Sequence, residues 1–200
     1  MNVKKRNGQL EPVDIDKINR VVEWACEGLE NVSVSEIELK SQIHMFDGIE
    51  TSVIHSLLIK SAADLISDTS PDYQYVSARL YMFQMRKEVY GGYEPPEFNQ
   101  FVRDMVARNL YDRDLVEKYT DEERIELGKF VNHDNDLKFS YAATQQWAGK
   151  YLVQDRVTKE IYETPQMAYM AIAMCLFQEE KSDIRLTLVN EFYRELTDGR

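Results

Sequence analysis

The stretch from Val3 to Ile18, VKKRNGQLEPVDIDKI, decides how the chain begins to fold. Asn7-Gly8 in its middle is the strongest short-range signal for a hairpin, because both central residues of the favoured turn need a positive φ. The segments on its two sides, residues 3–6 and 9–13, are therefore expected to pair as antiparallel strands. Pro12 has no N–H to donate to a ladder, so the second strand is expected at a sheet edge.

Four helical segments are expected after this hairpin. The first begins near Asp14 or Asp16 and repeats apolar residues every three to four positions, which indicates one buried face. That face comprises Ile15, Ile18, Val21, Val22, Ala25 and Leu29. The second helix begins with the pattern of a capping box, in which the Ser35 hydroxyl accepts from the amide of Glu38.

The third and fourth helices are expected to follow a short third strand within residues 45–49. The third helix is expected to be capped by Thr51 or Ser52. The fourth begins at Ser70-Pro71-Asp72, where a capping residue, a proline at the first helical position and an acid in the first turn follow one another. It extends to about Val89.

The segment from Gly91 to Pro96 breaks this pattern and is the expected domain boundary. It divides the chain into a domain of residues 1–92 and a helical domain of residues 93–200. The helices of the second domain are expected near residues 97–109, 113–118, 121–131, 165–178 and 182–196, with a second hairpin between residues 150–153 and 161–162. The expected fold class is mainly α, an α+β fold with four helices and a short sheet in its first domain.

Composition excludes several classes of protein. The chain has 200 residues, 44% of them hydrophobic, and a formal net charge of −11, which predicts a globular protein that does not bind nucleic acid. Its two cysteines, Cys26 and Cys175, form neither a CxxC motif nor metal-ligand spacing and are interpreted as small apolar helix residues. The first residues lack the apolar stretch of a signal peptide, and residues 167–177, the longest apolar run, are about half the length of a membrane span. We therefore expect a cytoplasmic protein without a membrane segment.

A small basic cluster is the first candidate for a binding site in this acidic chain. Its cations are Lys5, Arg6, Lys17, Arg86 and Lys87. Cations that converge can hold a triphosphate through charge-assisted hydrogen bonds. Thr51 and His55 share one face in the first turns of the third helix, and a helix N-terminus suits an anion. The alternative is that these lysines are solvated and that the histidine is structural.

Three other patterns have ordinary structural interpretations. Gly149-Lys150 lacks the leading glycine and the following Ser or Thr of a phosphate-binding P-loop. The spacing within His133-Asp134-Asn135-Asp136 matches no common metal site, so a solvated turn is favoured and no metal site is predicted. Trp24 and Phe83 lie on the first and fourth helices, where core packing is the favoured interpretation.

A longer ordered set of segments carries a family resemblance. The opening stretch has a basic strand, an Asn-Gly turn, a second strand and a helix that begins Asp-x-x-Lys-Ile. Further matching segments follow at residues 24–29, 47–55, 71–79, 86–91, 119–123, 139–143 and 150–153. Together they resemble the large subunit of class I, aerobic ribonucleoside-diphosphate reductases of the bacterial and bacteriophage type, beginning with its ATP-cone module.

The resemblance implies that residues 1–92 are an ATP-cone, a four-helix bundle capped by a short sheet. It binds ATP as an activator or dATP as an inhibitor, with Mg²⁺. The matching positions are Lys5, Arg6 and Lys87 for the triphosphate, Glu11 for the adenine edge, Lys17, Thr51 and His55 around the sugar and phosphates, and Val3 and Ile18 beside the base. Trp24 and Phe83 match positions where some members of the family hold a second nucleotide.

The resemblance also implies what this segment lacks. The catalytic cysteines and radical-relay tyrosines of the family lie on a ten-stranded barrel downstream, and neither cysteine here matches them. We therefore expect no catalytic residue and no redox cofactor, and no activity from this segment alone. The implied partners are the catalytic barrel, the radical-generating small (beta) subunit and further large subunits in a homo-oligomer. The compartment is the host cytoplasm if the protein is viral.

Two other functions are weighed against this interpretation by the same residues. A free-standing nucleotide sensor that controls transcription needs zinc-ribbon cysteines or a basic surface, and this chain has neither. A degenerate cone would bind no nucleotide and act only as a structural or subunit-interaction domain. The nucleotide-binding positions that it retains argue against the second alternative.

Overall fold

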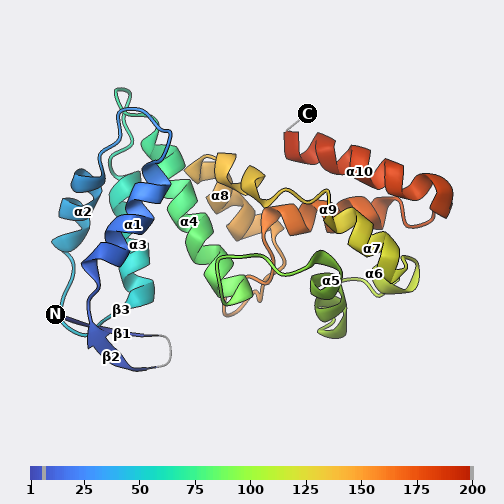
Figure 1. Ribbon diagram of the computed structural model, residues 1–200, viewed down its shortest axis with the longest axis horizontal. Coiled ribbons are helices and arrows are strands. Elements are labelled where there is room, and N and C mark those ends of the chain that lie inside the picture. The colour runs from blue at the N-terminus through green and yellow to red at the C-terminus, as the bar shows by residue number, and fades with distance from the viewer. Residues whose placement is uncertain (6–7, 199–200) are drawn as a thin grey trace. The chain divides into compact units, whose positions relative to one another are not determined.

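The computed structural model describes residues 1–5 and 8–198 and divides the chain into two compact units. Unit 1 comprises Met1–Met85 and Leu137–Gln146, and unit 2 comprises Arg86–Asp136 and Trp147–Arg200. Figure 1 shows the helices and strands of both units. Within the described residues no helix combines the length and the apolar character that crossing a membrane requires.

A three-stranded sheet opens unit 1. Strand β1 (Asn2–Lys4) pairs antiparallel with β2 (Leu10–Pro12) and parallel with β3 (Ile49–Glu50), so the strand of Pro12 lies at an edge, as predicted. Gly8 has φ +84°, which fits the predicted turn, whereas Asn7 lies outside the described residues. The third strand begins at the end of the predicted range, because Gly48 with φ +83° turns the chain immediately before it.

Four helices of unit 1 follow the predicted order. They are α1 (Ile15–Cys26), α2 (Val34–Gln42), α3 (Thr51–Ala63) and α4 (Tyr73–Tyr90), and the last continues beyond unit 1. Figure 1 shows the sheet at one end of α1 and α3. The core between them is apolar and includes Val22, Ala25, Ile37, Leu58, Val76 and Leu80. Ile15 was expected on the buried face, but it is exposed because it lies in the first turn of α1.

The helix starts differ from prediction at three places. The N-cap of α2 is Ser33, whose hydroxyl accepts from the amide of Glu36, rather than Ser35. Helix α3 begins with Thr51, and its N-cap residue Glu50 makes no side-chain cap bond. Helix α4 begins three residues after Ser70, because Asp72 instead accepts from the backbone N–H of Glu30 at 3.0 Å.

Unit 2 is built from helices and turns. Its elements are α5 (Phe98–Ala107), α6 (Asp114–Glu117), α7 (Asp121–Gly128), a π-helical turn η2 (Trp147–Tyr151), α9 (Pro165–Leu176) and α10 (Ser182–Asp198). The 3₁₀ helix η1 (His133–Lys138) ends in unit 1, where α8 (Tyr141–Gln146) places the ring of Tyr141 edge-on to Tyr81.

The predicted second hairpin is wrong over residues 150–152, because the chain there forms and leaves the turn η2. Val153 does pair: its carbonyl oxygen accepts from the Tyr162 N–H at 2.9 Å, and an antiparallel bridge joins Gln154 to Ile161. The N–H of Val153, which a ladder would use, donates instead to the Glu163 carboxylate at 2.7 Å.

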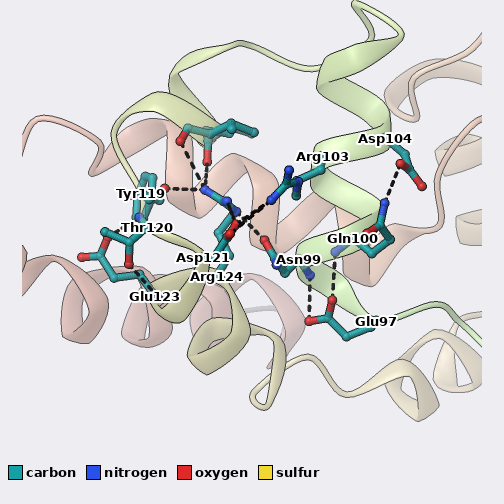
Figure 2. A network of polar contacts seen from close by, with 12 residues as sticks. Glu97, Asn99, Gln100, Arg103, Asp104, Tyr119, Thr120, Asp121, Glu123 and Arg124 are labelled. Atoms are coloured by element: carbon teal, nitrogen blue, oxygen red, sulfur yellow. Dashed lines mark hydrogen bonds and ion pairs between the residues drawn. The ribbon is translucent and has the colours of Figure 1, made fainter.

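A buried arginine joins three helices of unit 2. Figure 2 shows Arg124 on α7, which is 2% exposed and donates to Asn99 Oδ1 on α5 at 2.7 Å. It also donates to Asp121 and to the carbonyl oxygens of Leu115, Val116 and Tyr119. A capping box between Thr120 and Glu123 starts the same helix. The buried Arg124 guanidinium therefore supplies hydrogen-bond donors to carbonyl groups at the end of α6 and just after it.

Candidate functional site

The rim of the sheet carries the first predicted pair. Lys5 follows β1, Glu11 lies in β2, and Lys5 Nζ is 2.8 Å from Glu11 Oε1. The side chains are 34% and 46% exposed. An exposed ion pair contributes at most about 1 kcal/mol, so a polyanion can displace Glu11 from Lys5 at little cost. The two side chains lie together at the edge of the sheet and remain accessible to a ligand.

The sheet also places Val3 and Thr51. Val3 is buried at the centre of β1, between Glu11 on one side and Ile49 on the other. Strand β3 runs directly into α3, so Thr51 is the first residue of a helix whose start has no side-chain cap. The first-turn N–H groups of such a helix can receive an anion. Strand pairing thus brings the start of α3 to the sheet that carries Lys5 and Glu11.

Three aromatic rings form a cluster among α1, α3 and α4. The His55 and Phe83 rings are stacked, with centroids 5.2 Å apart and an interplanar angle of 18°, and Trp24 lies 5.8 Å from Phe83. All three side chains are half-buried. Trp24 also lines an open surface hollow of about 510 Å³. The stacking joins His55 and the two residues matched to a second nucleotide into one continuous group.

The remaining predicted residues lie at helix ends. Lys17 is exposed in the first turn of α1, where its backbone N–H donates to the N-cap Asp14. Ile18 is half-buried against the core of unit 1. Lys87 lies one turn after Phe83 in the last turn of α4, past the residue at which unit 1 ends. Arg6 lies outside the described residues.

Arg86 does not belong to a surface basic cluster, contrary to the sequence interpretation. Its side chain is 2% exposed, and its Nη2 donates to the carbonyl oxygen of His133 at 2.5 Å. The solvated turn expected at residues 133–136 is also wrong for Asp136, which is fully buried. No local sequence pattern indicates that Arg86 is buried, because its hydrogen-bond partner lies 47 residues further along the chain.

Burial shifts the pKa values of the groups around Arg86 in opposite directions. Burial raises the pKa of Asp136 to about 7, although the nearby Arg86 guanidinium opposes the shift. Burial lowers the pKa of His133 to about 4, and Arg86 adds to that effect. Near neutral pH the imidazole of His133 is therefore uncharged, whereas Asp136 titrates.

The two thiols lie in environments that disfavour the thiolate. Burial raises the pKa of Cys26 to about 11 and also raises the pKa of Cys175. A thiol with a raised pKa is a poor nucleophile at neutral pH. Within residues 1–5 and 8–198, no group of three His, Cys, Asp or Glu side chains could hold a metal ion.

Comparison with known proteins identifies two domain families in the chain. Residues 1–88 match the ATP cone domain, and residues 137–200 match the all-alpha domain of ribonucleotide reductase. The chain is 52% identical over 191 residues to subunit alpha of ribonucleoside-diphosphate reductase 1 from Escherichia coli K12, covering 96% of this chain and 25% of that protein. It is 43% identical over 199 residues to the subunit alpha of Enterobacteria phage T4, covering 98% of this chain and 26% of that protein. The chain therefore spans about a quarter of the length of the curated relatives it matches.

Proposed function

Because the chain belongs to the family of the ribonucleoside-diphosphate reductase alpha subunits, as their N-terminal regulatory region, we propose that its cone binds ATP or dATP. ATP activates and dATP inhibits the reduction of ribonucleotides by the full-length subunit. The observation that carries this proposal is the convergence of Lys5, Glu11 and the uncapped start of α3 on one small sheet.

Each side chain takes a role that its chemistry suits. The Lys5 and Lys87 ammonium groups hold the triphosphate together with Arg6 and a Mg²⁺ ion. The Glu11 carboxylate, released from Lys5, accepts from the adenine amino group. The remaining contacts are Lys17, Thr51 and His55 around the sugar and phosphates, and Val3 and Ile18 beside the base. Trp24 and Phe83 stack against a second nucleotide.

Discrimination between the two effectors rests on one 2′-hydroxyl. Losing the partner of a buried polar group costs about 1–3 kcal/mol. A difference of that size shifts an assembly equilibrium only if the two nucleotides differ in affinity for the two states. We expect dATP to favour an inhibited oligomer through the cone surface. Size measurements on the full-length enzyme with each nucleotide test this, and identical assemblies would rule it out.

The wider partners follow from the same family. The catalytic barrel of the large subunit, the radical-generating small subunit and further large subunits complete the enzyme in the cytoplasm of the cell or host. The segment described here supplies regulation and, by itself, reduces no ribonucleotide.

Calorimetric titration of the 200-residue chain with dATP or ATP, with Mg²⁺ present, tests the proposal. The Lys5→Ala, Lys87→Ala double variant should lose affinity by at least about a hundredfold, because each charge-assisted hydrogen bond contributes about 1.5–3 kcal/mol. The matched control is Lys4→Ala. Lys4 is the neighbouring lysine, but it points to the other face of the strand and pairs with Glu50 at 3.1 Å.

Each outcome of this titration has a definite meaning. Binding that the double variant loses and the Lys4 control keeps supports a nucleotide site at the rim of the sheet. A folded wild-type chain that binds neither nucleotide would instead indicate a degenerate cone that serves only subunit interaction.

A further inference from the structure

The chain passes between unit 1 and unit 2 at three points. These passages follow Met85, Asp136 and Gln146. Arg86 is the first residue after the first passage, and Asp136 is the last residue before the second. A contact near these two places joins segments that are some 50 residues apart in sequence. The first passage lies inside helix α4 and the second inside η1.

Arg86 makes that contact. Its Nη2 donates to the carbonyl oxygen of His133, the first residue of η1, at 2.5 Å, and its guanidinium lies 4.9 Å from the centre of the Tyr93 ring. The side chain is almost completely buried. A buried guanidinium that loses its acceptor is costly, so the bond is either made or replaced by another arrangement.

The same segment is also tied to α10 and, through it, to α9. Asn132 N–H donates to the Tyr193 hydroxyl at 2.9 Å, and Asn135 Nδ2 donates to Thr197 Oγ1 at 3.0 Å. The hydroxyls of Tyr193 and Thr197 both donate to Gln166 Oε1, at 2.6 and 2.9 Å. A displacement of η1 would therefore disturb hydrogen bonds to α10 and, through Gln166, to α9.

We propose that the Arg86–His133 contact is a clasp that couples nucleotide occupancy of the cone to η1 and the helices α9 and α10. The proposal rests on the proposed nucleotide binding, because Lys87, the expected phosphate contact, is the residue next to Arg86 on the last turn of α4. A helix turn moves as a unit. A phosphate that displaces Lys87 therefore displaces Arg86 as well, and hydrogen bonds weaken steeply with small changes of geometry.

Hydrogen–deuterium exchange of the 200-residue chain, with and without saturating dATP and Mg²⁺, tests the clasp. In the wild type we expect dATP to change the exchange rates of residues 133–138 by at least about fivefold, the lower limit of typical coupling between sites. Arg86→Met should still bind dATP, within about threefold of wild type, yet show no change in this segment. Arg86→Lys keeps the charge and should restore part of the response.

The matched control is Arg108→Met in unit 2. Arg108 is exposed, and its guanidinium also lies over an aromatic ring, 4.7 Å from the centre of Tyr162. This variant should respond to dATP as the wild type does. If the wild-type chain binds dATP without a change in the exchange rates of residues 133–138, the clasp is ruled out while the proposed function stands. The same conclusion follows if Arg86→Met shows the same change in exchange rates as the wild type. If wild-type chain binds no nucleotide, the proposed function fails and the clasp fails with it. Should Arg86→Met not fold, Arg86→Lys decides, because a response equal to that of the wild type or a complete loss of dATP binding would contradict the clasp.

Discussion

The two units differ in whether their charged side chains are buried. In the described part of the chain, every charged side chain that is almost fully buried belongs to unit 2, namely Arg86, Arg124, Asp136, Glu163 and Arg185. The buried polar side chains of unit 1 are hydroxyls: Ser41, Ser61, Ser77 and Thr144. Unit 1 keeps its charges at the surface, where they can exchange an internal partner for a ligand. Unit 2 also encloses charges, and two of them, Arg124 and Arg185, bond to side chains of other segments.

The largest effect expected from this difference is at Arg124. Arg124→Met should lower the free energy of unfolding by about 3 kcal/mol or more, because it leaves several buried carbonyl oxygens and Asn99 without a donor. Urea denaturation followed by circular dichroism measures the loss. Arg103→Met is the control. Arg103 pairs with the same Asp121 at 3.1 Å but is 51% exposed, so its removal should cost less than about 1 kcal/mol. Equal losses in the two variants would remove the distinction between fixed and exchangeable charges.

A pH-dependent effect is expected at Asp136. Its pKa is raised from 3.8 to about 7, so the folded state binds the proton more tightly than the unfolded state does. This group therefore stabilises the fold below about pH 4, and its contribution falls as the pH rises to about 7. Asp136→Asn should match wild-type stability near pH 4 and exceed it above pH 7 by a few kcal/mol.

The comparison must be made between variant and wild type, because other groups titrate beside Asp136. Arg86 on α4 is the cation beside it. Burial raises the pKa values of Tyr90, Tyr169 and Tyr193, and the charge of Asp136 adds to that effect. His133, with its lowered pKa, contributes stability that is lost as the pH falls from about 6.5 to 4, which opposes the trend of Asp136. Thermal melts of both proteins from pH 4 to pH 8 provide the test. A constant difference across that range would contradict a titrating Asp136.

A smaller effect on stability is expected from the serine that caps α2. Ser33→Ala removes the hydroxyl that accepts from Glu36 N–H and should lower the free energy of unfolding by about 1 kcal/mol. Ser35→Ala is the control, because Ser35 is exposed inside the helix and alanine favours helix there. Denaturation midpoints of the two variants measure the difference. A larger loss at Ser35 would restore the capping box expected from the sequence.

The smallest change in stability is expected at the rim of the sheet. Lys5→Ala and Glu11→Gln each break an exposed pair and should alter the free energy of unfolding by less than about 1 kcal/mol. The same Lys5 variant should weaken nucleotide binding about tenfold or more. Thermal melts and nucleotide titrations of the same protein preparation show whether the variant loses affinity without losing stability. A loss of stability that matches the loss of affinity would mean that Lys5 is a structural residue, like the buried charges of unit 2.

How far the sequence predicts the structure depends on how local each interaction is. The first hairpin and the start of α1 rest on neighbouring residues and were predicted correctly. Ser33 and Ser35 are each followed three residues later by a glutamate, so the local pattern could not choose between them. Tyr73 favours the first, because its hydroxyl accepts from Ser33 N–H and donates to the Glu36 carboxylate.

The candidate site shows the same limit. Periodicity placed Thr51 and His55 on one helix face, but it gave no sign that His55 stacks on Phe83 or that Lys5 pairs with Glu11. The roles of these residues toward ATP come from the family resemblance and remain predictions. The buried group around Arg86 was missed altogether, because helix periodicity describes one segment at a time and its partners belong to another.

Unit 1 is assembled from two separate stretches of chain, and this has a consequence for synthesis on the ribosome. Its second stretch, residues 137–146, is translated only after the 51 residues of unit 2 from Arg86 to Asp136 have been added. At about 5–20 residues per second, that interval lasts roughly 3–10 s. Until then Tyr81 has no Tyr141 to pack against. Chaperones and proteases that meet the nascent chain in those seconds meet a regulatory domain that is still incomplete.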